Sequence, residues 1–147
     1  MNAIEILVFD HQKVKKLFEQ SQVNPDQNIV EKVFRELEIH TKVEEEIFYP
    51  SVKNNVDSDL IEESLDDHTD IKDLIERLRG IDINDEEFKM VFQELIETVE
   101  SHVDIEETEL FPQVEGKMAS ELDNLGKRIK LLKDQLERGT ATRATSS

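Results

Sequence analysis

The stretch HTKVEEEIFYP (residues 40–50) returns in related form as HVDIEETELFP (residues 102–112). Each copy has a His, three further residues, two Glu, and then an aromatic residue next to Pro. Because one face of a helix repeats at steps of three and four residues, each His and the first Glu after it fall on the face that carries the apolar residues. Burying an unpaired carboxylate is costly, so these positions need a partner or a metal ion.

Turn-forming sequences on either side of these stretches divide the chain into amphipathic segments. Predicted N-caps are Asn24 ahead of Pro25, Asp57 or Ser58, and Asn84 or Asp85. Short loops make consecutive helices antiparallel neighbours. The expected fold is all-α, an up-down-up-down antiparallel four-helix bundle with helices near 2–21, 25–53, 58–79 and 85–111.

A fifth amphipathic helix is expected after the bundle, packed on it or on a partner. Its apolar positions recur at steps of three and four: Leu122, Leu125, Ile129, Leu132 and Leu136. The small, polar end of the chain is expected to be disordered. The predicted organisation is thus a bundle (1–116), a C-terminal amphipathic helix (117–137) and a disordered tail (138–147).

Composition excludes several classes of protein. The chain has 147 residues, which suits a single domain, and no cysteine, which excludes thiolate metal sites and Cys nucleophiles. A formal net charge of -17 argues against a nucleic-acid partner. No apolar run is long enough for a membrane span and no basic signal segment is visible, so we expect a cytoplasmic protein with no membrane partner.

The sequence also repeats over a longer distance. DHQKVKKLFE (residues 10–19) matches DHTDIKDLIE (residues 67–76) at Asp, His, a β-branched residue, Lys, Leu and Glu. With the repeated His-x-x-x-Glu pair, the chain consists of two copies of one helical hairpin. Two copies in one bundle predict a pseudo-two-fold arrangement, so that a site built by one hairpin is mirrored by the other.

All the histidines lie on core faces of the expected helices. At about 1.5 Å per residue they can sit within roughly two turns of one level. With the two glutamates they form a candidate metal-ligand set: His11, His40, Glu44, His68, His102 and Glu106. Six ligands are too many for one tetrahedral zinc ion. Nitrogen and oxygen donors suit iron or manganese at two centres, and zinc is also possible.

His11, HTKVEE (residues 40–45), the DH pair at 67–68 and HVDIEETELFP together resemble the hemerythrin-like (HHE cation-binding) domain family over about residues 4–114. The resemblance implies a non-haem di-iron centre of two Fe ions inside the bundle, completed by an oxo or hydroxo bridge. It implies that the four histidines are terminal ligands and that Glu44 and Glu106 bridge both metals.

One position departs from the family's oxygen carriers. Those proteins have a fifth His one turn after the His of the third helix, where this chain has Lys72, and the first repeat has Lys15 at the equivalent place. This argues against reversible O2 carriage. The iron–sulfur-repair and nitric-oxide-responsive branch resembles this chain in using four His and two Glu, although its repair proteins carry a Cys-bearing segment that this sequence lacks.

Three functions follow as alternatives. The first is a di-iron protein that binds O2, NO or a peroxide for sensing, storage or detoxification, in a stress response for example. The second is a redox enzyme with the same centre, reducing peroxide or NO or acting as in iron–sulfur repair. The third is a metal-free interaction module. In each case the chain would be a monomer or a homodimer formed through the C-terminal helix.

Residues next to the candidate ligands in sequence are expected to lie away from the metal site. Tyr49 follows Glu44 by five residues, so it is expected at the core rim or an interface, with a radical role or a contact to the ligands as the alternative. Asp10 and Asp67 each precede a candidate His and point about 100° away, so they are expected to be exposed. The second Glu of each motif, Glu45 and Glu107, is expected to be exposed for the same reason.

Overall fold

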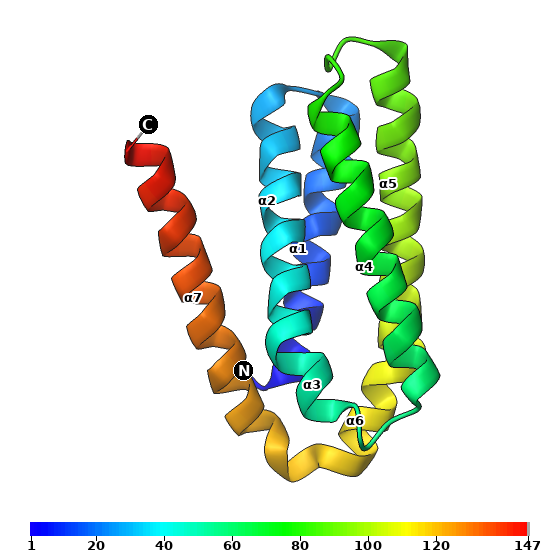
Figure 1. Ribbon diagram of the computed structural model, residues 1–147, viewed down its shortest axis with the longest axis vertical. Helices are drawn as coiled ribbons and strands as arrows, with labels where there is room; N and C mark the ends of the chain where they lie inside the picture. The colour runs from blue at the N-terminus through cyan, green and yellow to red at the C-terminus, as the bar shows by residue number, and fades with distance from the viewer. Residues whose placement is uncertain (147) are drawn as a thin grey trace.

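The structure is a computed structural model that describes the backbone of residues 1–146 and the side chains of residues 1–139. Every regular element in this part of the chain is a helix, which confirms the predicted all-α class. Four long helices run side by side in alternating directions (Figure 1): α1 (Ala3–Val23), α2 (Gln27–Val43), α4 (Ser58–Arg79) and α5 (Glu86–Ile105). The pairs α1–α2 and α4–α5 make the most extensive contacts, as two hairpins should.

The helix starts explain where the hairpins turn. Side chains of Asp57 and Asp85 cap α4 and α5 by accepting backbone N–H bonds, as the sequence predicted. The prediction that Asn24 caps α2 is wrong. Asp26 accepts the N–H of Ile29 and caps α2, while the N–H of Asn24 bonds back to Gln20 at the end of α1.

Both α2 and α5 change character at the Glu that follows the motif His. Short π-helical segments begin there and lead directly into further α-helix: η1 (Glu44–Phe48) into α3 (Tyr49–Val52), and η2 (Glu106–Leu110) into α6 (Phe111–Met118). The N–H of Tyr49 bonds five residues back, to the carbonyl of Glu44. Pro50 and Pro112 each lie in the first turn of the next α segment, where no N–H donor is needed.

The apolar core has two parts separated by a polar layer. The lower cluster, at the bottom of Figure 1, is built around Leu7, Val43, Phe48, Leu110 and Ile129. The upper cluster, nearer the α1–α2 turn, is built around Phe18, Phe34, Ile71, Phe92 and Leu95. The candidate ligands fall between these two groups along every long helix, so the polar layer crosses the whole bundle.

The expected fifth helix is present as α7 (Leu122–Ser146), reached through the short 3-10 helix η3 (Ala119–Glu121). Its first half packs on α1, α2 and η1, with Leu122, Leu125 and Ile129 buried in the lower cluster. The helix continues past Glu137, where a disordered tail (138–147) was predicted; residue 147 lies outside the described residues. None of the described helices is long and apolar enough to cross a membrane.

Gly126 lets α7 approach the start of α1. A Cβ atom at this position would lie 2.9 Å from backbone atoms of Met1, Asn2 and Ala3. We expect Gly126→Leu to lower the free energy of unfolding by about 1–3 kcal/mol, because rigid backbone must move to admit the side chain. Urea denaturation measures this loss. Gly116→Leu is the control, since no atom lies within 4 Å of its Cβ position; equal losses in both variants would show that close approach is not the reason.

Candidate metal centre

The six candidate ligands converge in the polar layer between the two clusters. They come from all four long helices and both π segments: His11 (α1), His40 (α2), Glu44 (η1), His68 (α4), His102 (α5) and Glu106 (η2). Each of the six side chains is buried. The histidines are at most 7% exposed, and Glu44 and Glu106 are fully buried. The structure therefore brings together every residue that the sequence singled out.

These side chains form two overlapping ligand sets. In the first set, His11, His40, Glu44 and Glu106 have potential ligand atoms within 4.8 Å of one another; the second set consists of Glu44, His68 and His102 under the same limit. Glu44 belongs to both. Glu106 also reaches both halves, because its Oε1 lies 3.1 Å from Nε2 of His11 and 3.4 Å from Nε2 of His102. The geometry suits two neighbouring cations with carboxylates between them.

Four atoms of the layer are buried without a hydrogen-bond partner. Among the described residues they are Nε2 of His11, Nε2 of His40, Oε2 of Glu44 and Oε1 of Glu106. Two of them, Nε2 of His11 and Oε1 of Glu106, lie at ion-pair distance, 3.1 Å apart. Buried polar atoms are rarely left unpaired, and these carry lone pairs suited to a metal. Imidazole and carboxylate donors without thiolates fit iron, manganese or zinc.

Each imidazole ring is hydrogen-bonded to a carboxylate through Nδ1, on the side of the ring away from Nε2. Nδ1 of each His pairs with a different acid: His11 with Glu107 at 2.7 Å, His40 with Asp10 at 3.1 Å, His68 with Glu45 at 2.8 Å and His102 with Asp67 at 3.1 Å. Such partners orient a metal-binding His so that Nε2 is free for the metal. The polar layer thus contains the candidate metal ligands together with the carboxylates that orient their imidazole rings.

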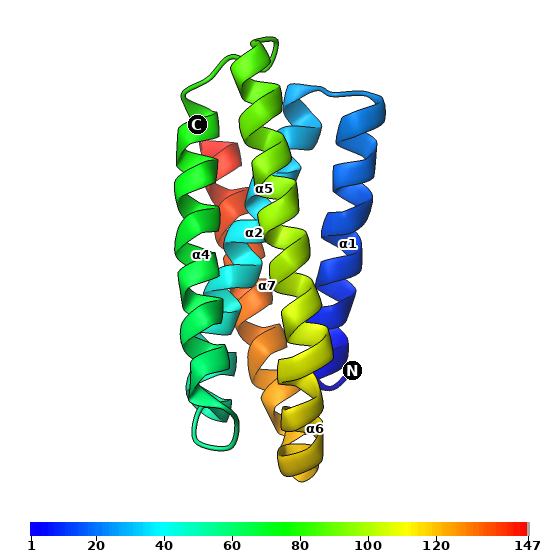
Figure 2. The same ribbon diagram turned by 90° about the vertical axis from the view of Figure 1, so that its right-hand side faces the viewer.

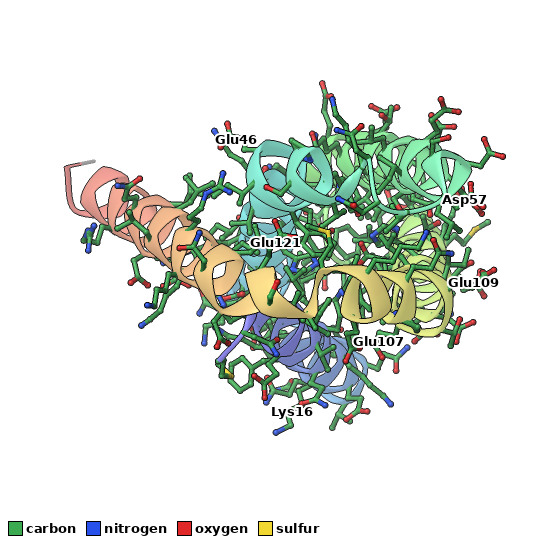
Figure 3. The ribbon with its side chains drawn as sticks, turned by 90° about the horizontal axis from the view of Figure 1, so that it is seen from below. Lys16, Glu46, Asp57, Glu107, Glu109 and Glu121 are labelled. Atoms are coloured by element: carbon green, nitrogen blue, oxygen red, sulfur yellow. The ribbon has the colours of Figure 1, made fainter. Side chains whose placement is uncertain are left out.

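The predicted exposure is confirmed for Glu107 but is wrong for Asp10, Asp67 and Glu45. Asp10 is 2% exposed, and the side chains of Asp67, Glu45 and Glu107 are 26%, 27% and 36% exposed. A residue 100° from the core face was assumed to meet water. In a bundle such a residue can contact the neighbouring helix instead, and each of these acids contacts Nδ1 of a histidine. Figure 3 shows Glu107 lying toward α1, whereas Glu46 and Glu109 extend from the rim of the bundle.

Tyr49 is a site residue that the sequence placed elsewhere. Its hydroxyl donates to Oε2 of Glu106 at 2.6 Å and lies 3.1 Å from Oε1 of Glu44 and 3.2 Å from Nε2 of His68. Counting in steps of three and four put Tyr49 off the ligand face. The π-helical turn, which closes over five residues, returns it to that face.

The hydroxyl of Tyr49 also breaks the symmetry between the two halves. The equivalent position in the second copy of the motif is Phe111, whose ring lies 5.9 Å from that of His11 at an interplanar angle of 6°. Tyr49 contacts His68 in the matching place, with ring centroids 5.4 Å apart. The two otherwise similar halves differ here by one oxygen atom.

Electrostatics in the layer favour a charged pairing of imidazoles and carboxylates. Burial opposes protonation of His40, but Glu44 and Asp10 outweigh it and raise its pKa to about 10. Similar balances raise the pKa values of the other three histidines. Burial alone would raise the pKa of Glu44, but His40 and its neighbours hold it well below its usual range. Burial and the adjacent carboxylates raise the pKa of Tyr49 well above 10, so it remains a donor.

Metal binding should therefore release protons. His40, with a pKa raised to about 10, carries a proton at neutral pH, and a metal needs the neutral imidazole. We expect metal affinity to increase with pH and to level off only as pH passes about 10, the pKa of His40. Calorimetry in buffers of different ionisation enthalpy measures the protons released; identical heats in all buffers would contradict this expectation.

A helical bundle with histidines and carboxylates converging at mid-height defines a class of buried metal-binding bundles. The chain belongs to the hemerythrin family, since the model of the hemerythrin HHE cation binding domain matches residues 2–114 and again 59–144. This confirms the resemblance inferred from the motifs. The second match begins in α4, in keeping with the internal repeat.

A solved structure and a relative in sequence are also similar to this chain. The structure of a hemerythrin HHE cation binding domain-containing protein from Mycobacterium kansasii superposes with a TM-score of 0.85, at 22% identity, covering 100% of this chain and 93% of that one. A protein of Nostoc sp. named DNA nickase is 30% identical over all of this chain. The chain spans only 43% of the length of that relative.

Proposed function

We propose that this chain is a non-haem di-iron protein that binds O2, NO or a peroxide for sensing, storage or detoxification. The observation that carries the proposal is a pair of buried ligand sets that share Glu44 and contain unpaired nitrogen and oxygen atoms. His11 and His40 would hold one ion, and His68 and His102 the other. Glu44 and Glu106 would bridge them. Bound iron would supply electrons and open coordination positions.

A small cavity beside the layer supports a small ligand. Its volume is about 20 Å³, and its walls comprise His11, His40, His102, Asp10, Thr41 and the apolar residues Val14, Leu37, Ile71, Val99 and Val103. This is room for roughly one water-sized molecule. The size matches a diatomic gas or a peroxide.

Anaerobic iron loading followed by metal analysis tests the proposal. We expect about two iron ions per chain, and an absorption or paramagnetic signal that changes when O2, NO or peroxide is added. Parallel loading with manganese and zinc identifies the preferred metal. Substantially less than about one metal ion per chain after loading would refute the proposal and favour the metal-free interaction module.

One observation favours turnover as a second candidate. The Tyr49 hydroxyl donates to Glu106 at 2.6 Å and lies 3.1 Å from Glu44, so it is a hydrogen-bond donor placed where it could assist proton delivery to the layer. Proton supply is needed when peroxide or NO is reduced. Sustained consumption of either with an added electron donor would support an enzyme, and binding without turnover would support the first candidate.

The name of the Nostoc relative raises DNA as a substrate. Our proposal does not include it, because a net charge of -17 repels the phosphate backbone. Incubation of the metal-loaded chain with supercoiled plasmid tests this point directly. Conversion to the nicked form that requires Glu106 would overturn it.

A further inference from the structure

The helix α7 brings a lysine to the polar layer from outside the four-helix bundle. Nζ of Lys133 forms an ion pair with Oδ1 of Asp10, whose other oxygen, Oδ2, lies 3.1 Å from Nδ1 of His40. Asp10 is 2% exposed and the Lys133 side chain 14% exposed, so the pair is largely removed from water. A continuous contact therefore runs from α7 through Asp10 to a candidate metal ligand.

The position of Lys133 on α7 is well defined. Ile129, one turn earlier, is fully buried against the bundle, and Gly126, two turns earlier, lies against the backbone at the start of α1. These three residues share one face of α7. Lys133 is thus delivered by a helix that is held in place, unlike a surface lysine that pairs by chance.

The other half of the site has no equally buried counterpart, because the lysine found there, Lys72, pairs at 2.8 Å with Glu45 behind His68 but has a side chain that is 51% exposed. Asp67 holds His102 at the same 3.1 Å, but its side chain is 26% exposed, and among side chains 1–139 its ion pair is with His102 alone. Figures 1 and 2 show α7 beside α2, on the opposite side of the bundle from α4 and α5. A pseudo-two-fold site is therefore made unequal by an element outside the repeat.

We infer that Lys133 is a positioning residue that acts through Asp10 on His40 and makes the two metal positions different. The inference rests on the proposed metal site. The ammonium group of Lys133 offsets the negative charge of Asp10. The imidazole of His40 therefore hydrogen-bonds to an ion pair with no net charge. His102 bonds to Asp67, a partly exposed carboxylate that has no lysine partner among side chains 1–139. The half-site of His40 should thus have the weaker electron donor, and its geometry should depend on α7.

Side-chain nitrogen NMR of the full chain, metal-free and zinc-loaded, tests the inference. We expect Lys133→Met to shift the Nδ1 signal of His40, to leave that of His102 unchanged, and to strengthen zinc binding at one of the two positions, because Asp10 then makes His40 a stronger electron donor. Lys133→Arg keeps the charge and should restore the parent spectrum. Lys130→Met removes the same charge from an exposed site on α7 and should change neither signal.

Two outcomes would overturn the inference: a His40 signal equal to that of the parent, or equal shifts at His40 and His102. If circular dichroism shows that Lys133→Met is unfolded, Lys133→Gln takes its place, because glutamine keeps a hydrogen-bond donor but not the charge. The metal-free spectra decide the link from Lys133 to His40 even if no metal binds. Failure of metal binding in the parent would instead refute the proposed function, so the two failures are distinguishable.

Discussion

Glu106→Gln is expected to abolish the paired metal centre while the helical bundle remains folded. Oε1 of Glu106 approaches His11 and His102, which belong to different halves, so its charge serves both metal positions. The amide is nearly the same size and keeps a hydrogen-bond acceptor, but it no longer offsets two cations. We expect metal affinity to fall on the order of a hundredfold or more, because loss of positioning groups alone costs up to that much.

Metal content by elemental analysis and the visible spectrum of the iron-loaded chain measure the effect, and circular dichroism checks the fold. Glu109→Gln is the matched control, since Glu109 is exposed three residues later and extends from the rim of the bundle (Figure 3). Full metal content in Glu106→Gln, or an empty site in Glu109→Gln, would mean that the ligand face of η2 has been wrongly assigned.

Glu107→Gln should weaken metal binding by about 10–100-fold through His11, although Glu107 is not itself a proposed ligand. Its Oε2 lies 2.7 Å from Nδ1 of His11, and this bond lowers the pKa of Glu107. The neutral amide orients the imidazole less firmly and no longer raises its basicity. By the internal symmetry, Glu45→Gln should have a similar effect through His68, at 2.8 Å.

Competition with a chelator of known affinity gives the size of this effect. Glu46→Gln, one residue beyond Glu45 and exposed, provides the comparison. Unchanged metal affinity in both Glu45→Gln and Glu107→Gln would show that these carboxylates do not contribute to metal binding.

The fold and the six candidate ligands were accessible from sequence because both follow from periodic patterns. Apolar residues at steps of three and four define the faces that pack, and the capping residues Asp57 and Asp85 mark where two helices begin. Polar residues on those faces stand out against the pattern. His40 and Glu44 could be recognised in this way without any knowledge of their neighbours.

The residues that were missed depend on contacts that one helix cannot reveal. Tyr49 required a π-helical turn, and Asp10 required knowing which helix lies beside α1. The repeats did contain a signal. Asp precedes His in both copies and a second Glu follows the first in both, so the acids that hold the imidazoles repeat together with the ligands. Lys133 could not be inferred, since α7 has no second copy.

The crossed pairing of the carboxylates has a consequence for assembly. Within each hairpin one His is held by that hairpin's own Asp, but His11 depends on Glu107 and His68 on Glu45, which belong to the opposite hairpin. Each hairpin therefore has three ligands yet lacks the acid that orients one of them. Neither half can complete its own metal position, so docking of the hairpins and metal uptake should be a single cooperative event.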